Sequence, residues 1–342
     1  MKKIVFFILS LLLISTFFSC KKESSDKLYI YNWTYYIPDE VIKGFEQKFG
    51  VKVVYDVFAS NEEMFAKLKA GGTGYDITFP SGDYTSIMIK EGMIDKIDMN
   101  KVPNIANIDK DVIAKIKFDP NLEFSVPYMM GAAGIGVNAK YIKDFKKDTS
   151  IFLRPEVKGR ITLLDDMREV MALAEKELGF SVNTVNQEEL NKTKELILSW
   201  KNNLQKFDSE AFGKGFAAGE FWIVQGYAEN IFLELDDNMK KDVVFFIPEK
   251  GTGMYMDSMV ILKDAKNKDL AHKFLNYIHE PESYAKICDF LMLPCMNVPA
   301  RSKTAVKPNY TIEDLKNCEF REDLGENLEL YNKIWQDIRI GN

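Results

Sequence analysis

Apolar and polar positions follow two different periods along the chain, and the two periods alternate. Residues 28–33 alternate with a period of two, as in a half-buried strand, and residues 51–57 are apolar and β-branched, as in a buried parallel strand. Between them, residues 38–49 place apolar side chains on one helical face before a glycine. Residues 75–79 continue the series as a third strand. The pattern predicts an α/β fold with helices covering both faces of a mostly parallel sheet.

Two glycine-containing passages predict where the chain crosses between two lobes. The first is the glycine-rich run 131–136, and the second is Gly-Thr-Gly at 251–253. Between them, residues 187–207 have the apolar periodicity of one long amphipathic helix. We therefore expect two discontinuous lobes, formed by residues 27–131 with 254–300 and by residues 132–253 with 301–342, hinged as a clamshell.

The first twenty residues predict a targeting segment. Two lysines precede an apolar run from residue 4 to 19, which is short for a membrane-spanning helix and typical of a signal-peptide core. Its end resembles a bacterial lipoprotein signal, with Cys20 as the lipid acceptor and residues 21–26 as a polar tether. A plain secretion signal and an uncleaved anchor are the alternatives.

The charge distribution and the cysteines indicate which kinds of partner and which cysteine roles to expect. The net charge of −6 is spread along the chain without a basic cluster, which disfavours a nucleic-acid partner. Cys288, Cys295 and Cys318 include no CxxC pair, and we interpret the first two as small core residues. Whether Cys288 and Cys295 form a disulfide stays open.

The sequence offers little machinery for catalysis. Its only two histidines, His272 and His279, are predicted on a solvated helix flank with no acidic or cysteine partner at metal-binding spacing. Asp166 and Glu169 could be a glycosidase carboxylate pair, but their spacing at a helix start also suits a helix-dipole role. We expect no enzyme activity, no metal and no cofactor.

Aromatic residues and carboxylates recur at the predicted strand ends and in the turns beside them. The aromatic residues are Trp33, Tyr36, Tyr84, Tyr227 and Tyr255, and the carboxylates are Asp83, Asp166, Glu169 and Asp257. Ring faces attract cations, and carboxylates form charge-assisted hydrogen bonds with ammonium groups. Because strand ends carry the ligands of open α/β sheets, this set predicts a site for an apolar chain with a positive charge at each end.

Several motifs resemble the bacterial periplasmic polyamine-binding proteins, the solute receptors of ATP-driven putrescine and spermidine importers. The resemblance covers nearly all of the chain after the targeting segment, in the same order. Its motifs include YNWTYYIP at 31–38, YDITFPSGDY at 75–84, VPYMMGAAGIGVN at 126–138 and LLDDMREV at 163–170. The resemblance implies a type II periplasmic-binding-protein fold, with mixed, mostly parallel sheets joined by a two-strand hinge.

The resemblance also implies roles for individual residues. By position, Trp33, Tyr36 and Ser81 would line the ligand cleft. Glu169 would hold a terminal amine with Asp166 as a helper, and Asp257 would grip a further amine. Tyr227 and Tyr255 stand where the family has other aromatic residues.

Three positions depart from the pattern of the spermidine-preferring members. Asp83 and Leu293 stand in place of tyrosines, and Arg321 in place of a glutamine. A cation at Arg321 would repel one end of a long polyamine unless Asp83 or Glu322 neutralises it. Our hypothesis is that putrescine binds well and spermidine less well.

The implied partners are a polyamine, an ABC permease and its ATPase. The implied setting is a monomer in the periplasm, attached to the membrane by lipid on Cys20. The same fold also serves receptors for anions, ferric iron, sugars or other small cations. A thiamine-degrading enzyme with a cleft cysteine is another alternative, because Cys295 is close to Leu293 in sequence. The third alternative is a sensor or adhesin that uses its outer surface and not the cleft.

Overall fold

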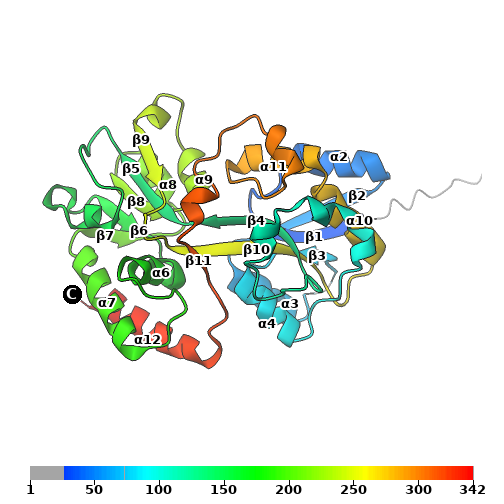
Figure 1. Cartoon of the computed structure of the whole chain (residues 1–342), viewed down its shortest axis with the longest axis horizontal. Coiled ribbons are helices and arrows are strands. Elements are labelled where there is room, and N and C mark those ends of the chain that lie inside the picture. Colours follow the sequence, from blue (N-terminus) through cyan, green and yellow to red (C-terminus); the bar gives the residue numbers. More distant parts are fainter. Residues whose placement is uncertain (1–26, 73, 342) are drawn as a thin grey trace, which may run out of the picture.

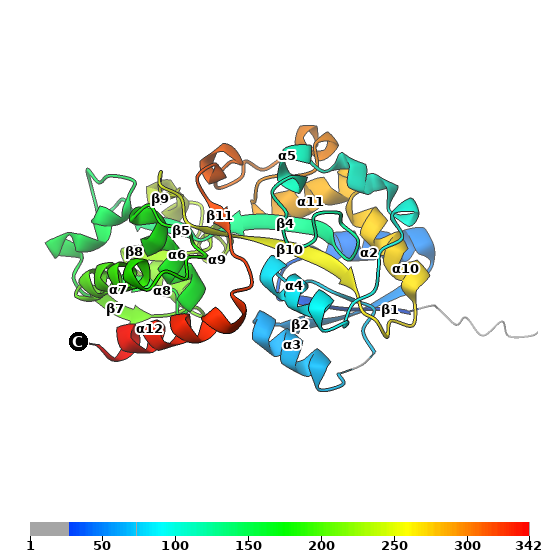
Figure 2. The same cartoon turned by 60° about the horizontal axis from the view of Figure 1, so that its bottom comes forward.

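The computed structural model describes residues 27–72 and 74–341, which form two sheets with helices on both faces of each. The first sheet contains β1 (Lys27–Trp33), β2 (Lys52–Phe58), β3 (Ile77–Thr78), β4 (Val126–Ala132), β10 (Gly253–Ile261) and β11 (Glu319–Phe320). Its helices are α2 (Asp39–Phe49), α3 (Asn61–Lys69), α4 (Gly82–Lys90), α5 (Lys110–Ile113), α10 (Lys268–Ile278) and α11 (Pro281–Leu291). In Figures 1 and 2, α2, α10 and α11 lie on one side of this sheet and α3 and α4 on the other.

The second sheet contains β5 (Gly134–Asn138), β6 (Ile161–Leu163), β7 (Leu204–Phe207), β8 (Ile223–Gly226) and β9 (Val243–Phe246). Its helices are α6 (Met167–Glu177), α7 (Gln187–Lys201), α8 (Phe212–Ala217), α9 (Ala228–Phe232) and α12 (Leu328–Ile340). Helices α6, α7 and α12 pack together, and α8 packs on α9. We call the parts built on the first and second sheets lobe 1 and lobe 2.

Both sheets mix parallel and antiparallel pairs. The first has the order β11-β10-β3-β1-β2, with β4 also paired to β10, and the second has the order β7-β6-β8-β5-β9. Strands β4 and β10 are antiparallel neighbours, and each passes near its end into a strand or loop of lobe 2 (Figure 2). The predicted fold class is confirmed, because these two long strands join two discontinuous lobes. The lobe boundaries at single residues stay a prediction.

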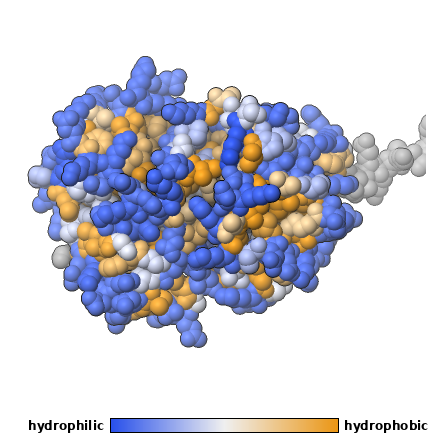
Figure 3. All heavy atoms as spheres, in the orientation of Figure 1, coloured by the Kyte–Doolittle hydropathy of each residue, from blue (hydrophilic) through white to orange (hydrophobic). Residues whose placement is uncertain are grey.

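Each lobe has its own hydrophobic core. In lobe 1, Phe45 contacts Phe274 of α10 with ring centroids 5.0 Å apart, and in lobe 2, Trp200 contacts Phe152 at 5.3 Å. Apolar burial is the main favourable term for each lobe. Hydrophilic residues cover much of the face seen in Figure 3, with hydrophobic residues in separate patches.

The predicted long helix at 187–207 was wrong at its end. Helix α7 stops at Lys201, and residues 204–207 form β7, which pairs in parallel with β6. The Asn203 side chain donates hydrogen bonds to the carbonyl oxygens of Phe152 and Arg154 at 2.9 and 3.2 Å. These contacts hold the chain in a turn, so tertiary pairing overrides the helical periodicity.

The two histidines are buried, so their predicted exposure was also wrong. His272 Nε2 accepts a hydrogen bond from the backbone N–H of Asp98 at 2.9 Å. The His279 ring stacks on Tyr284 with centroids 5.3 Å apart, and burial lowers its pKa to about 4. Helix α10 is covered on several sides by α2, α11 and the segment before α5, which its own periodicity does not reveal.

The targeting segment, the tether and Cys20 lie outside the described residues. Within residues 27–72 and 74–341, no helix is long and apolar enough to cross a membrane. Cys288, Cys295 and Cys318 are free thiols in this part of the chain, and Cys288 is buried as expected.

Candidate functional site

The first half of the candidate site is built around Asp257 on β10. The Asp257 side chain is 4% exposed, and both of its oxygens accept hydrogen bonds from hydroxyl groups. Tyr36 Oη donates to Oδ2 and Ser81 Oγ donates to Oδ1, each at 2.6 Å. Burial raises the pKa of Asp257 to about 6, and the two hydroxyl donors oppose that rise. Among the described residues, this buried carboxylate is hydrogen-bonded and forms no ion pair, although the charge of Arg321 also lowers its pKa.

Backbone irregularity in β10 sets the position of this carboxylate. The β10–β4 pairing shifts register between Asp257 and Ser258, and Ser81 forms an isolated bridge with Asp257 just after β3. Register shifts of this kind re-aim the side chains beside them. Tyr36 comes from the turn that follows β1 and Ser81 from the segment that follows β3, so two strand ends of lobe 1 meet at an acid in the middle of β10.

The second half of the site is built around Glu169 in the first turn of α6. Asp166 is the N-cap of this helix, and its side chain accepts a hydrogen bond from the backbone N–H of Glu169 at 3.0 Å. The Glu169 side chain is fully buried. Its Oε1 atom contacts Arg321 Nη1 at 2.8 Å and accepts a hydrogen bond from Tyr227 Oη at 2.9 Å. Burial raises the pKa of Glu169, and the Arg321 charge opposes that rise.

Arg321 is neutralised by an acid other than the two we expected. The backbone N–H of Arg321 donates to Met254 O at 3.2 Å, which places the residue directly after β11. Its guanidinium pairs with Glu169, whereas Glu322 pairs with Lys117 at 2.8 Å. The charge of Asp83 helps to raise the pKa of Arg321 but forms no ion pair with it among the described residues. The expected neutralisation by Asp83 or Glu322 is therefore replaced by a pair with the amine-binding candidate itself.

Two tyrosines join the halves. The rings of Tyr227 from lobe 2 and Tyr255 from β10 meet edge to face, with centroids 5.9 Å apart. Opposite Tyr255 on β4 is Gly131, where an added Cβ would lie 2.5 Å from Tyr255 Oη. Gly131 therefore leaves room for the ring of Tyr255. The glycine-rich passage that was predicted as a crossing between lobes thus also makes space for a site residue.

Trp33 and Tyr84 have different surroundings. The Trp33 indole N–H donates to Phe79 O at 2.8 Å, and its ring lies 4.6 Å from that of Phe58, so the side chain is fixed at the end of β1. Tyr84 instead turns toward α3, where its hydroxyl donates to Glu62 at 3.0 Å. The structure brings Tyr36, Ser81 and Asp257 together, and it brings Glu169, Tyr227 and Arg321 together. It does not join Tyr84 to either group.

One acid beside the site was missed in the sequence. Glu229 lies in the first turn of α9, two residues after Tyr227. Burial raises its pKa to about 7, and the charge of Asp257 adds to the rise. The available signal was an acid at the start of a helix that follows a strand end, the same arrangement that singled out Asp166 and Glu169.

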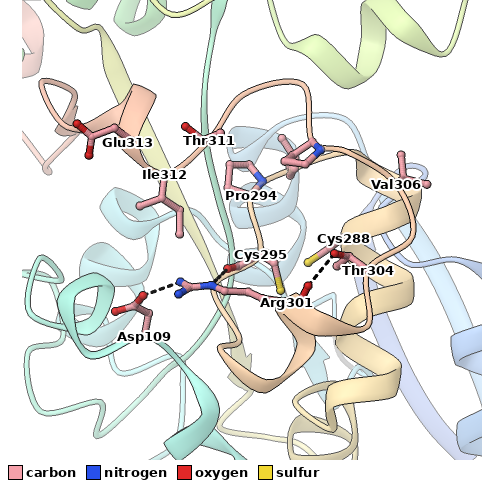
Figure 4. Close-up of a pocket in the computed structure, with 12 residues that line it drawn as sticks. Asp109, Cys288, Pro294, Cys295, Arg301, Thr304, Val306, Thr311, Ile312 and Glu313 are labelled. Carbon is pink, nitrogen blue, oxygen red and sulfur yellow. Dashed lines mark hydrogen bonds and ion pairs between the residues drawn. The ribbon is translucent and has the colours of Figure 1, made fainter.

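A cavity lies away from these residues. It has a volume of about 470 Å³ and is lined by residues that include Leu293. Cys288, Cys295 and Arg301 are among its other lining residues, as Figure 4 shows. Arg301 contacts Asp109 there at 2.5 Å, and none of the predicted ligand-binding residues lines it. Cys295 is therefore placed outside the group of acids and rings. Among the described residues, no cluster of three potential metal ligands occurs.

Acids and rings from two lobes, meeting beside the strands that connect them, define a two-lobed solute-binding protein. The chain belongs to the bacterial extracellular solute-binding protein family, which it matches over residues 40–311. This is a family of binding proteins and not of enzymes.

Named relatives and solved structures narrow the comparison. The chain is 35% identical over 328 residues to the spermidine/putrescine-binding periplasmic protein of Escherichia coli, covering 93% of each chain. It is 33% identical over 289 residues to the putrescine-binding periplasmic protein SpuD of Pseudomonas aeruginosa, covering 80% of this chain and 79% of the relative. The crystal structure of the Tp0655 (TpPotD) lipoprotein of Treponema pallidum is 44% identical, with a TM-score of 0.89, and the match covers 92% of this chain and 99% of that one.

Proposed function

We propose that this protein is an extracytoplasmic receptor that binds a polyamine, putrescine or spermidine or both, and delivers it to an ABC importer. The relatives named as putrescine- and spermidine-binding periplasmic proteins match it over most of their length. The observation that carries the proposal is Asp257, a nearly buried acid with no cationic partner among the described residues.

The chemistry of Asp257 favours an organic cation. A buried carboxylate is stable only when its charge is matched, and an ammonium group supplies both the charge and N–H donors. Tyr255 lies two residues before this acid on β10, and its ring meets that of Tyr227 from lobe 2. These rings can pack methylene groups and attract a cation to their faces. Trp33 would cover the ligand from the end of β1.

The hinge between the two lobes explains how the protein would capture a ligand. A ligand that contacts Asp257 in lobe 1 and Tyr227 in lobe 2 binds the closed form more tightly than the open form, and so shifts the population toward closure. The closed receptor would dock on a membrane permease with its ATPase. We further propose that the protein works as a periplasmic monomer, without catalysis, attached to a membrane by lipid on Cys20.

The test is calorimetric titration with putrescine, spermidine, spermine and cadaverine, after denaturation and refolding to remove any bound ligand. We expect binding of at least one polyamine. The variant Trp33→Ala should weaken it about tenfold or more, in line with the loss of a ring that packs and attracts the cation. The matched control is Trp222→Ala, because Trp222 stacks on Tyr141 in lobe 2, outside the site.

An absence of heat with all four polyamines would reject the proposal. A sensor or adhesin that uses its outer surface would be the next candidate, and mass spectrometry of the native protein would identify any ligand it retains. Equal weakening by the two tryptophan variants would reject the assignment of Trp33 to the site.

A further inference from the structure

The pair between Glu169 and Arg321 differs from the other ion pairs of the described chain in its burial. The Glu169 side chain is 0% exposed and that of Arg321 is 11% exposed. Every other ion pair among residues 27–72 and 74–341 has a partner that is at least 30% exposed. Ion pairs at the surface contribute little to stability. In a buried pair, each charge depends on the other, because removing one partner leaves an unmatched buried charge.

This pair changes what Glu169 can offer to a ligand. Oε1 already forms an ion pair with Arg321 and accepts a hydrogen bond from Tyr227, and the charge of the acid is matched by the guanidinium. Oε2 is buried and has no hydrogen-bond partner in the described chain, so one acceptor remains. The acid can therefore still accept an N–H group, but a second cation placed there would also face the positive charge of Arg321 at short range.

The two buried acids therefore have unequal roles. Among the described residues, Asp257 accepts hydrogen bonds from hydroxyl groups and forms no ion pair, so its charge remains available to the ligand. Burial opposes the charged form of Arg321, but the charge of Glu169, with smaller contributions from Asp166 and Asp83, raises its pKa, so the guanidinium stays protonated. A diamine can put one ammonium at Asp257 and direct its other end away from Arg321. A triamine carries a further ammonium group on a longer chain, and an ammonium group that reaches Glu169 would have to share that acid with the guanidinium.

We infer that Arg321 is a specificity-determining residue, a built-in cation that occupies the position of a ligand ammonium at Glu169 and makes the site select diamines over triamines. The inference rests on the proposed polyamine function and deepens it. It assigns the selection to the charge of Arg321 and not to its size.

The experiment compares putrescine with spermidine by calorimetry on the refolded protein. In Arg321→Gln the donor groups remain but the charge is lost, so we expect the spermidine-to-putrescine ratio of association constants to rise about tenfold or more. In Arg321→Lys the charge remains, and the ratio should stay within about twofold of the wild type. The matched control is Lys117→Gln, which removes a cation from the exposed pair with Glu322 and should leave the ratio unchanged.

A ratio that stays the same in Arg321→Gln would overturn the inference, as would an equal rise in Arg321→Lys. If Arg321→Gln does not fold, the double variant Glu169→Gln with Arg321→Gln removes both buried charges and leaves none unmatched. A smaller rise in the ratio is then expected, because the guanidinium is gone but Glu169 no longer supplies a charge, and an unchanged ratio overturns the inference. If the wild type binds a polyamine but the ratio does not change in the variant, only the role of Arg321 is rejected. If the wild type binds no polyamine, the proposed function is rejected as well.

Discussion

Asp257 and Glu169 are both buried carboxylates of the same site, yet their partners differ in kind. Asp257 in lobe 1 is held by the neutral hydroxyls of Tyr36 and Ser81, whereas Glu169 in lobe 2 is held by the guanidinium of Arg321 and by Tyr227. Hydroxyl donors orient a carboxylate but do not neutralise its charge, whereas a guanidinium orients the carboxylate and also neutralises it. Burial and acidity alone therefore do not identify the acid that binds a cation. The charge of the neighbouring donor decides which acid remains available.

The largest effect should come from removing the unpaired charge. Asp257→Asn should weaken polyamine binding about 30-fold or more, since losing one partner of a buried, hydrogen-bonded charge pair costs about 2–5 kcal/mol. Glu169→Gln should weaken it about tenfold or less, because Arg321 already matches that charge. Calorimetry on both variants measures the contrast, and Asp39→Asn on the exposed start of α2 is the control. A greater loss in Glu169→Gln than in Asp257→Asn would reverse our assignment of the two acids.

Acidification should weaken binding through the same residue. The pKa of Asp257 is raised to about 6, so the acid is charged above that pH and becomes neutral below it, while a polyamine stays protonated throughout. We expect the affinity for the ligand to change little above pH 7, where the remaining titration of Glu229 adds a small increase, and to fall about tenfold per pH unit below pH 6.

The control for this pH dependence is Asp257→Asn, whose residual binding should lose the transition near pH 6. Titrations from pH 5 to pH 8 at constant ionic strength would measure both profiles. A wild-type affinity that does not change over this range would show that ionised Asp257 is not required.

Much of lobe 1 and one half of the site could be predicted from the sequence, because both follow from local patterns. Alternating strands and helices indicated the fold, and the acids and rings were found at strand ends, where such folds bind ligands. The contact between Tyr36 and Asp257 joins residues 221 positions apart, and Ser81 reaches the same acid across 176 positions. That such distant residues would converge was expected from topology, but which hydroxyl bonds which oxygen was not.

The parts that could not be predicted depend on which elements pack together. Arg321 was expected to be neutralised by Asp83 or Glu322, but the parallel pairing of β11 with β10 brings it to Glu169. The histidines of α10 have an exposed-looking pattern and are covered by other helices and loops. In both cases the neighbour comes from another part of the chain, so the local sequence pattern could not predict it.

A smaller effect is expected from the second acid near Asp257. The pKa of Glu229 is raised to about 7 by burial and by Asp257, so this group is partly protonated at neutral pH. Glu229→Gln should weaken putrescine binding only about threefold to tenfold, because a partly neutral acid contributes part of a charge-assisted hydrogen bond. Calorimetry at pH 8, where Glu229 is mostly charged, should show a larger loss than calorimetry at pH 6. A loss that does not depend on pH would mean that the residue acts by shape and not by charge.

A third buried acid tests whether burial alone has any influence on binding. Glu175 lies on α6 with Glu169, accepts a hydrogen bond from Tyr331 at 3.0 Å, and has its pKa raised by burial to about 8. Between its ordinary pKa of 4.5 and about 8, the folded protein holds a proton that the unfolded chain releases, so stability falls as the pH rises. Glu175→Gln should remove this loss and increase the free energy of unfolding at pH 8.5 by an amount on the order of 3 kcal/mol, with little change at pH 4.5. Urea unfolding at the two pH values, with Glu195→Gln on the exposed side of α7 as the control, measures this difference. Polyamine affinity should stay unchanged, because Glu175 contacts Tyr331 and none of the ligand-binding candidates. A loss of affinity would instead mean that the charge of α6 as a whole, and not the partner of each acid, governs binding in lobe 2.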